Sequence, residues 1–208
     1  MALIKSIAGN EICDQTCRNT VNNISIGGRN LYTGTADFSN VPNGNVWMNV
    51  NAWVVSNTSI NYQGIKKDAR RYVKWSGLHQ RVYLPIGTYT LSAYLSKSGG
   101  ATDFDVRLYL IDNNVENVAT VTNNGELVTS KLTNQYVRYH KTFNVTKAGI
   151  VSARFEKASG FDTDTTQLFW VTALKLESGN KATDWSPAPE DICAMTDDGN
   201  GNVTIGIY

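Results

Sequence analysis

The sequence predicts an all-β fold, and its composition and patterning are the two observations behind this. The chain has 22 Asn, 21 Thr and 17 Gly among its 208 residues, while only 18% of the residues are charged. Such a composition favours strands and tight turns over long helices. Several segments also alternate apolar and polar residues with the period of two that a half-buried strand requires. At this length one β domain can bury a core without disulfide staples.

Residues 168–176 give the clearest buried strand. Both of its alternating sets are apolar, with Leu168, Trp170, Leu174 and Leu176 in one set and Phe169, Val171 and Ala173 in the other. A strand of this kind is covered on both faces. Residues 178–180 then form a turn, and the two prolines after Trp185 end regular pairing because proline cannot donate to a ladder. We expect Trp185 to plug the end of the sheet.

The remaining strands follow from alternation and from turn residues. We predict them at residues 46–55, 59–63, 70–75, 80–84, 88–95, 104–111, 117–122, 135–145 and 150–156. One shared core should then receive Tyr89, Leu91, Ala93, Leu95, Phe104, Val106, Leu108 and Leu110, together with Val137, Tyr139, Phe143 and Val145.

Residues 46–55, with the sequence VWMNVNAWVV, are the first candidate for a binding surface. One face of this predicted strand is apolar, and the other carries Trp47, Asn49, Asn51 and Trp53. Flat indole rings can stack on the C–H face of a pyranose, and amides can hydrogen-bond its hydroxyl groups. The alternative is that both indoles cover the sheet beneath a loop.

The outward faces of other strands supply the second half of this candidate groove. Tyr72, Tyr94, Arg107, Tyr109 and Arg154 are the further saccharide-binding candidates, and Trp75 is either a core residue or a binding platform. Asp105 and Glu156 could share a face, as the two carboxylates of a glycosidase do, but binding sites also use carboxylates to accept sugar hydroxyls. The sequence has no nucleophile elbow, P-loop, dinucleotide fingerprint or zinc-protease motif. We therefore expect a binding protein without catalytic activity.

Three motifs carry a resemblance to a known family. They are Arg29-Asn30-Leu31 after a glycine pair, the segment from Pro85 to Tyr94, and the segment from Leu174 to Asp191 with its Asp-Trp-Ser-Pro core. Together they resemble the carbohydrate-binding-module-like domains of bacteriophage tail, baseplate and fibre proteins, over residues 28–191. The resemblance implies a jelly-roll β-sandwich similar to galactose-binding modules. It also implies a virion component that binds glycans of the host surface or of mucus; some members of the family only build the particle.

The ends of the chain differ from this sandwich, which we place at residues 29–191. In residues 1–28, Asn10 can cap a short helix with a narrow apolar stripe of Cys13, Cys17, Val21 and Ile24. Such a helix needs a partner, and we expect contacts with other virion proteins or with further copies of the chain, with a trimer as the expected oligomer. Residues 192–208 should form a turn and a strand. The N-terminal apolar run is too short for a secretory signal, so we expect a virion protein made in a host cytoplasm.

The net charge of +1 gives no reason to expect a nucleic acid or a membrane as partner. Basic residues do concentrate between Lys66 and Arg81, which predicts either an ordinary solvated strand or a basic rim for anionic wall polymers. Sugar-binding sandwiches of the resembled kind often hold a structural calcium ion, and Asp184 is the position that we consider for one.

Overall fold

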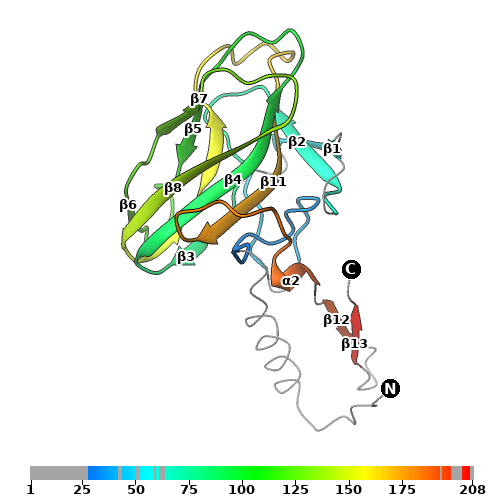
Figure 1. Cartoon of the computed structure of the whole chain (residues 1–208), viewed down its shortest axis with the longest axis vertical. Helices are drawn as coiled ribbons and strands as arrows, with labels where there is room; N and C mark the ends of the chain where they lie inside the picture. The colour runs from blue at the N-terminus through cyan, green and yellow to red at the C-terminus, as the bar shows by residue number, and fades with distance from the viewer. Residues whose placement is uncertain are drawn as a thin grey trace.

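The computed structural model of the chain describes residues 28–41, 44–49, 52–58, 60, 64–192, 194–197 and 203–206. The fold of these residues is all-β, as predicted (Figure 1). The elements are β1 (Val54–Asn57), β2 (Lys67–Arg71), β3 (Val82–Leu84), β4 (Gly87–Lys97), β5 (Val106–Tyr109), β6 (Thr120–Val121), β7 (Glu126–Thr129), β8 (Val137–Lys147), β9 (Gly149–Val151), β10 (Arg154–Lys157), β11 (Phe169–Ser178), the helical turn α2 (Pro189–Ile192), β12 (Ala194–Asp197) and β13 (Val203–Gly206).

The first layer is a six-stranded sheet with the order β1-β2-β11-β4-β8-β6. Every neighbouring pair in it is antiparallel. The predicted buried strand, β11, lies inside this sheet between β2 and β4. Its position explains the apolar run, because a central strand loses solvent contact on both faces when other segments cover the sheet.

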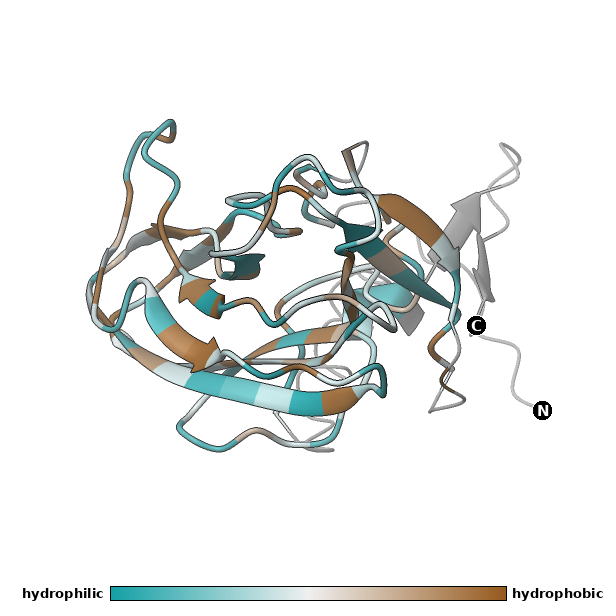
Figure 2. Ribbon diagram, turned by 90° about the horizontal axis from the view of Figure 1, so that it is seen from above, coloured by the Kyte–Doolittle hydropathy of each residue, from teal (hydrophilic) through white to brown (hydrophobic). Residues whose placement is uncertain are grey.

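The second layer consists of the three-stranded sheet β10-β5-β7 and the pair β3-β9. The Ser152 N–H donates to the Leu110 carbonyl at 2.8 Å, which joins these two sheets into one surface. Seen from above, the two layers lie face to face (Figure 2). The strands of the two layers bury a single main core, so the molecule is a β-sandwich.

The predicted core residues mostly lie where alternation places them. The residues of β4 and β5 assigned to the core are all buried, as are Phe143 and Val145 on β8. Tyr139 packs against the same core from a half-buried position, but Val137 is largely exposed near the start of β8. A contact between the Phe104 and Phe169 rings, 6.1 Å between centroids, connects the two layers.

The face assignment within β11 changes at a β-bulge between Thr172 and Lys175. Ala173 has a φ of 53° there, and the extra residue reverses the alternation of everything that follows. Leu174 and Leu176 therefore join Phe169 in the main core, and Ala173 faces the opposite side. The prediction that Leu174 and Leu176 share a face with Trp170 was wrong for this reason.

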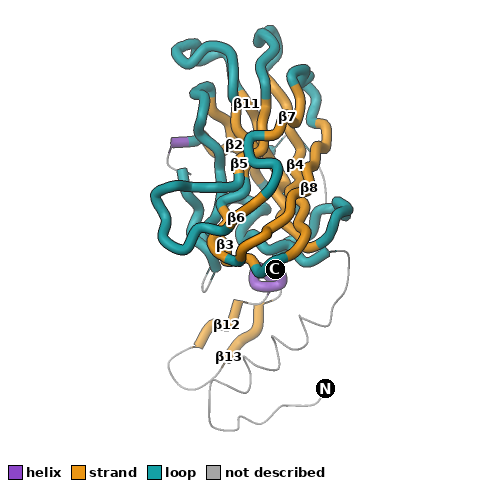
Figure 3. The backbone as a smooth tube through the Cα atoms, turned by 90° about the vertical axis from the view of Figure 1, so that its left-hand side faces the viewer, coloured by secondary structure: helices purple, strands orange, loops and turns teal. Residues whose placement is uncertain are grey.

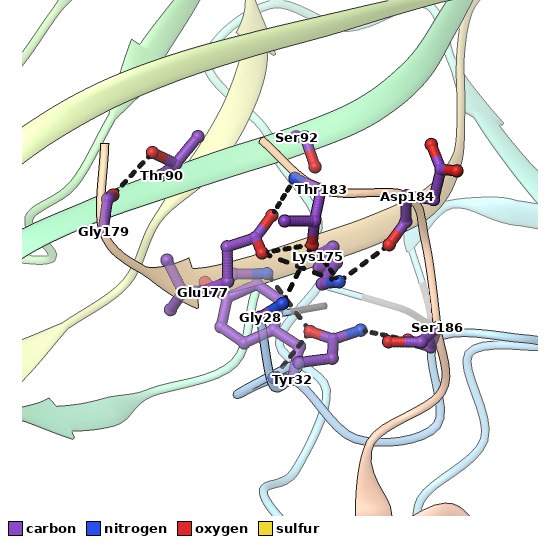
Figure 4. A network of polar contacts seen from close by, with 12 residues as sticks. Gly28, Tyr32, Thr90, Ser92, Lys175, Glu177, Gly179, Thr183, Asp184 and Ser186 are labelled. Carbon is purple, nitrogen blue, oxygen red and sulfur yellow. Dashed lines mark hydrogen bonds and ion pairs between the residues drawn. The ribbon is translucent and has the colours of Figure 1, made fainter. Parts of the chain in front are cut away.

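The bulge also directs Lys175 and Glu177 into a buried polar network on the outer side of the sheet (Figure 4). The Lys175 Nζ donates to the Thr183 Oγ1 and to the Asp184 carbonyl, both at 2.7 Å. Glu177 accepts hydrogen bonds from the N–H and the hydroxyl of Thr183. Asn30 donates to the carbonyls of Leu174 and Ser186 and accepts from the Leu176 N–H. The segment after β11 thus satisfies both buried charges, and Asn30 ties the N-terminal segment to the same region.

Trp185 lies at the centre of a second, smaller apolar cluster, and it packs on the face of the sheet beside Ala173 at the β11 bulge, whereas the prediction had it plug the end of the sheet. Its indole is buried against Ala173 and Ile65, and its Nε1 donates to the Thr35 hydroxyl at 3.1 Å. The Leu174–Asp191 motif thus has a structural role, because it docks the segment after β11 onto the sheet.

Residues 46–55 do not form the predicted strand. Only β1, from Val54, is regular; Met48 makes a single bridge to His79, and Asn49 has a φ of 64°. A left-handed residue breaks the alternation of a strand, so the two indoles do not share an outward face. Trp47 is 3% exposed and Trp53 is 5% exposed. The alternative interpretation, in which these indoles are core residues beneath a loop, is therefore the correct one.

The two ends of the chain are described only in part. The predicted N-terminal helix and its apolar stripe fall outside the described residues. The predicted C-terminal strand is instead an antiparallel hairpin of β12 and β13, which follows α2 at the end of the sandwich away from the long loops (Figure 3). Within the described residues, no helix is long and apolar enough to cross a membrane.

Candidate functional site

The candidate site lies on the outer face of the sheet β10-β5-β7. Val106 and Leu108 of β5 point into the core, so Arg107 and Tyr109 point outward. Phe155 of β10 is likewise buried, which leaves Arg154 and Glu156 on the outer face. The register pairs Tyr109 with Arg154 and Arg107 with Glu156, so strand pairing alone gathers these side chains on one surface.

Trp75, from the segment between β2 and β3, adds an exposed indole to this face. The side chain is 58% exposed, and its ring meets Tyr109 edge to face with 5.9 Å between centroids and 77° between the ring planes. The φ of Trp75 is 55°, a conformation that is unfavourable for a bulky residue and persists only when its surroundings enforce it. The Trp75 N–H donates to the Lys157 carbonyl at 3.0 Å, which is part of that enforcement.

Gly77 brings the Trp75 segment close to β10. A Cβ atom on Gly77 would lie 2.9 Å from the Cβ of Arg154, so only glycine fits there. The Gly77 carbonyl accepts a hydrogen bond from the Asn49 amide at 3.0 Å and faces the His79 Nδ1 at 3.1 Å. Asn49, predicted as a sugar contact, therefore contacts the segment that carries Trp75.

Lys157 supports the same segment from the interior. Its ammonium is almost fully buried and donates to the carbonyls of Tyr72, Phe161 and Gln167 at 2.9, 2.8 and 3.2 Å. Burial lowers the pKa of this ammonium, and the nearby Asp162 opposes the shift. Since one cation holds both Tyr72 and the 161–167 loop, Lys157 ties the segment that leads to Trp75 to that loop.

The charges on the candidate site occur in pairs. The Arg154 Nε donates to Glu156, and its Nη1 donates to the carbonyls of Ile111 and Ser152. Arg107 lies 3.5 Å from the Asp105 carboxylate and donates to the Gly125 carbonyl at 3.1 Å. The guanidinium of Arg154 is also 6.0 Å from the centre of the Tyr109 ring. Donors and acceptors therefore surround the two aromatic rings.

Burial raises the pKa of the Tyr109 hydroxyl, and the negative charge of Glu156 raises it further. The phenol therefore stays protonated over the ordinary pH range, so that it can both donate and accept a hydrogen bond.

The predicted site residues divide into those that this face brings together and those that it does not. Arg107, Tyr109 and Arg154 share the face. Tyr94 lies on the outer side of the other layer, where its ring is 5.8 Å from the Arg138 guanidinium, because β4 and β5 belong to opposite sheets and their outward faces diverge. The prediction of one groove containing both tyrosines was wrong. Asn51 falls outside the described residues.

Trp47 and Trp53 are removed from the candidate site by their packing. Trp47 meets Tyr32 and Phe38 edge to face, with 5.9 and 5.2 Å between ring centroids. Trp53 contacts Phe169 in the same manner at 5.9 Å. Neither ring has a free face for a sugar, so the prediction that they form stacking platforms was wrong.

The basic segment 66–81 does not form a single rim. The Arg70 guanidinium lies 4.7 Å from the Trp170 ring on the outer face of the six-stranded sheet, whereas the Lys74 Nζ lies 3.5 Å from Asp162 beside the candidate site. These positive charges lie apart, because Arg70 is on β2 whereas Lys74 follows the end of that strand, in the segment that leads to β3.

The predicted calcium site has no ligand cluster. Asp184 is exposed, and its contribution to the polar network is its backbone carbonyl. In the part of the chain that the structure describes, no three His, Cys, Asp or Glu side chains are placed to hold a metal ion.

The sequence left Trp75 undecided between a core position and a binding platform, and it offered Asp105 and Glu156 either as a hydrolytic pair or as acceptors of sugar hydroxyls. The signal that could have identified Trp75 is the Trp-Ser-Gly sequence that follows β2, since an aromatic residue beside a turn is placed to project from the sheet. The contact between Trp75 and Tyr109 joins segments that are far apart in the chain, and a local sequence pattern cannot predict such a contact.

Comparison with known proteins adds similarity at the level of the fold. No known family model and no curated protein sequence matches the chain. The xylan-binding CBM22-1 domain of Paenibacillus barcinonensis Xyn10C is 16% identical with a TM-score of 0.47, over 75% of this chain and 98% of that domain. The baseplate tripod of bacteriophage Tuc2009 is 15% identical with a TM-score of 0.38, over 80% of this chain and 61% of the tripod chain.

A third similar structure contains the CBM22-1 and GH10 modules of Clostridium thermocellum xylanase 10B in complex with xylohexaose. It is 13% identical with a TM-score of 0.42, over 77% of this chain and 30% of that one. At these identities and TM-scores, what this chain binds has to follow from its own residues.

Proposed function

We propose that the chain is a saccharide-binding module of jelly-roll type, without catalytic activity, whose site is the outer face of β10-β5-β7 around Trp75 and Tyr109. The observation that carries this proposal is the exposed Trp75 ring, held in an unfavourable backbone conformation at right angles to a second aromatic ring. An indole exposed to water and a strained backbone both make the folded state less stable. Ligand binding by the ring would explain why this arrangement is kept.

The surroundings of the two rings suit a sugar. An aromatic ring packs against the apolar C–H face of a pyranose, while Arg107, Asp105 and the Tyr109 hydroxyl can bond to its hydroxyl groups. A corner of two rings and a few polar groups should bind weakly, because the interactions must first offset the entropy lost on association. Useful affinity would then come from several copies acting together.

A place on a phage particle is a further part of this proposal. It rests on the motifs at Arg29–Leu31 and Leu174–Asp191, and it would supply the several copies that weak binding requires. The second candidate function is a purely structural virion protein. The observation that favours this alternative is the burial of Trp47 and Trp53, which leaves the Trp75 face as the principal argument for binding.

A polysaccharide-binding screen with the intact chain and the Trp75→Ala variant distinguishes these functions. We expect the intact chain to be retarded in native gels that contain a polysaccharide and the variant to migrate as in an empty gel. Tyr83→Ala is the matched control, because Tyr83 is similarly exposed, at 61%, but lies on β3 and not on β10-β5-β7. Equal retardation of the intact chain and Trp75→Ala would exclude this site. No retardation by any polysaccharide would favour the structural alternative.

A further inference from the structure

The structure assigns to the Trp75–Tyr109 site a preference for uncharged saccharides, an inference that rests on the proposed function and narrows its ligand. The basis is charge pairing around the two rings. Four cationic side chains lie on or beside this face, and each is already matched by a carboxylate. The pairs are Arg154 with Glu156, Arg107 with Asp105, Lys74 with Asp162, and Arg81 with Asp112.

Lys157 is a further cation below this face, and its charge is not available to a ligand. The ammonium is almost fully buried and directs its N–H groups at three backbone carbonyls. An anionic sugar would therefore have to displace an existing carboxylate to gain a cation. It would also have to approach the partly exposed Asp105 carboxylate, which repels it.

The hydrogen-bonding groups at the surface lead to the same conclusion. The side chains of Asp105 and Arg107 are 32% and 36% exposed, so a ligand meets a carboxylate acceptor and guanidinium donors together. A sugar hydroxyl both donates and accepts, and it can satisfy both groups. A ligand carboxylate or phosphate only accepts, so it would leave Asp105 desolvated without a partner.

Arg70 provides the contrast within the same molecule. It stacks over Trp170 on the opposite layer, and among the described residues no carboxylate lies within ion-pair distance of it. An anionic polymer that binds this protein should therefore use the Arg70 face and not the Trp75 face. Substitutions on the Trp75 face should therefore affect the binding of neutral sugars, and substitutions on the Arg70 face should affect the attraction of anionic polymers.

The test compares neutral and anionic polysaccharides in affinity gels, at low and at high salt, with the intact chain and three variants. We expect a neutral polysaccharide such as galactan, glucan or xylan to retard the intact chain at both salt concentrations and to lose this effect with Trp75→Ala. Polygalacturonate should bind at least about tenfold more weakly, which corresponds to about 1.4 kcal/mol. Any residual binding of polygalacturonate should disappear in high salt and with Arg70→Ala.

The Asp105→Asn variant tests the same preference through an expected gain of affinity. Removing that carboxylate frees the Arg107 guanidinium, so the affinity for polygalacturonate should rise about tenfold while Trp75 remains necessary. Tighter binding of polygalacturonate than of every neutral polymer by the unmodified chain, lost with Trp75→Ala, would overturn the preference but keep the saccharide site. Failure of a folded chain to bind any polysaccharide would instead remove the proposed function, and this inference with it.

Discussion

Trp47 and Trp75 carry the same side chain in opposite environments, and this difference makes their roles separable. Trp47 is packed between Tyr32 and Phe38 in the core, whereas Trp75 has one ring neighbour among the described residues and an exposed face. Trp47→Ala should lower the free energy of unfolding by about 3–5 kcal/mol through loss of packing and creation of a cavity. Trp75→Ala should lower it by less than about 1 kcal/mol. Urea denaturation measures both, and similar losses for the two variants would contradict the assigned positions.

His79 gives the site region a dependence on pH. Burial and the neighbouring Arg154 charge lower the pKa of the imidazole from 6.5 to about 4. The folded state therefore binds a proton less readily than the unfolded state does. The contribution of the neutral His79 imidazole to the free energy of unfolding is therefore complete above pH 6.5. It is lost as the pH falls through about 4, because the unfolded state binds the proton first.

The matching experiment is chemical denaturation of the intact chain and of His79→Gln from pH 7 to pH 4. Relative to the variant, the intact chain should become progressively less stable over this interval, because glutamine has no proton to gain. The variant also controls for Asp191, whose pKa is raised to about 6 by burial. Protonation of Asp191 stabilises the folded state as the pH falls, opposite to the effect of His79, and it does so equally in the intact chain and in the variant. Parallel stability curves would show that His79 does not titrate as its burial implies.

At the scale of the elements, the loop between β10 and β11 and the segment after β2 depend on one buried ammonium. Lys157→Met keeps most of the side-chain volume but leaves three carbonyls without their donor. We expect a loss of about 3 kcal/mol in the free energy of unfolding, since each buried group left without a partner costs about 1–3 kcal/mol. Lys147→Met, at an exposed position on β8, should change stability by less than about 0.5 kcal/mol. A neutral effect of Lys157→Met would exclude this supporting role.

The elements also show what alternation can and cannot predict. The long strands β4 and β8 were predictable because their period of two continues for many residues, and the core positions on β4 and β5 followed from such alternation. β11 was predictable from its continuous apolar run. The bulge at Ala173 was not predictable, since nothing in the residue types announces the extra residue that reverses the faces after it. Residues 46–55 alternate as regularly as any true strand, yet the left-handed Asn49 and the packing of two indoles in the core override that pattern.

At the scale of the whole molecule, the candidate site depends on which layer each strand joins. Tyr94 and Tyr109 both point outward, as alternation predicts, but they lie on opposite sides of the sandwich because β4 and β5 are in different sheets. Arg107, Tyr109 and Arg154 could be predicted as site residues because they occupy one sheet. Trp75 reaches them through a connection across layers, stabilised by Gly77 and Lys157, and tertiary packing of that kind has no signature in a local pattern.

Trp75, and not the buried indoles, is the tryptophan that we propose to bind the saccharide. The chain has five tryptophans, so indole N–H signals in a two-dimensional NMR spectrum, assigned by single Trp→Phe variants, can follow each of them while an oligosaccharide from the best neutral polymer is added. We expect the Trp75 signal to shift in a saturable manner and the signals of Trp47, Trp53 and Trp185 to stay in place. Saturable binding that leaves the Trp75 signal unchanged would contradict the proposal that Trp75 contacts the saccharide and would place the site elsewhere.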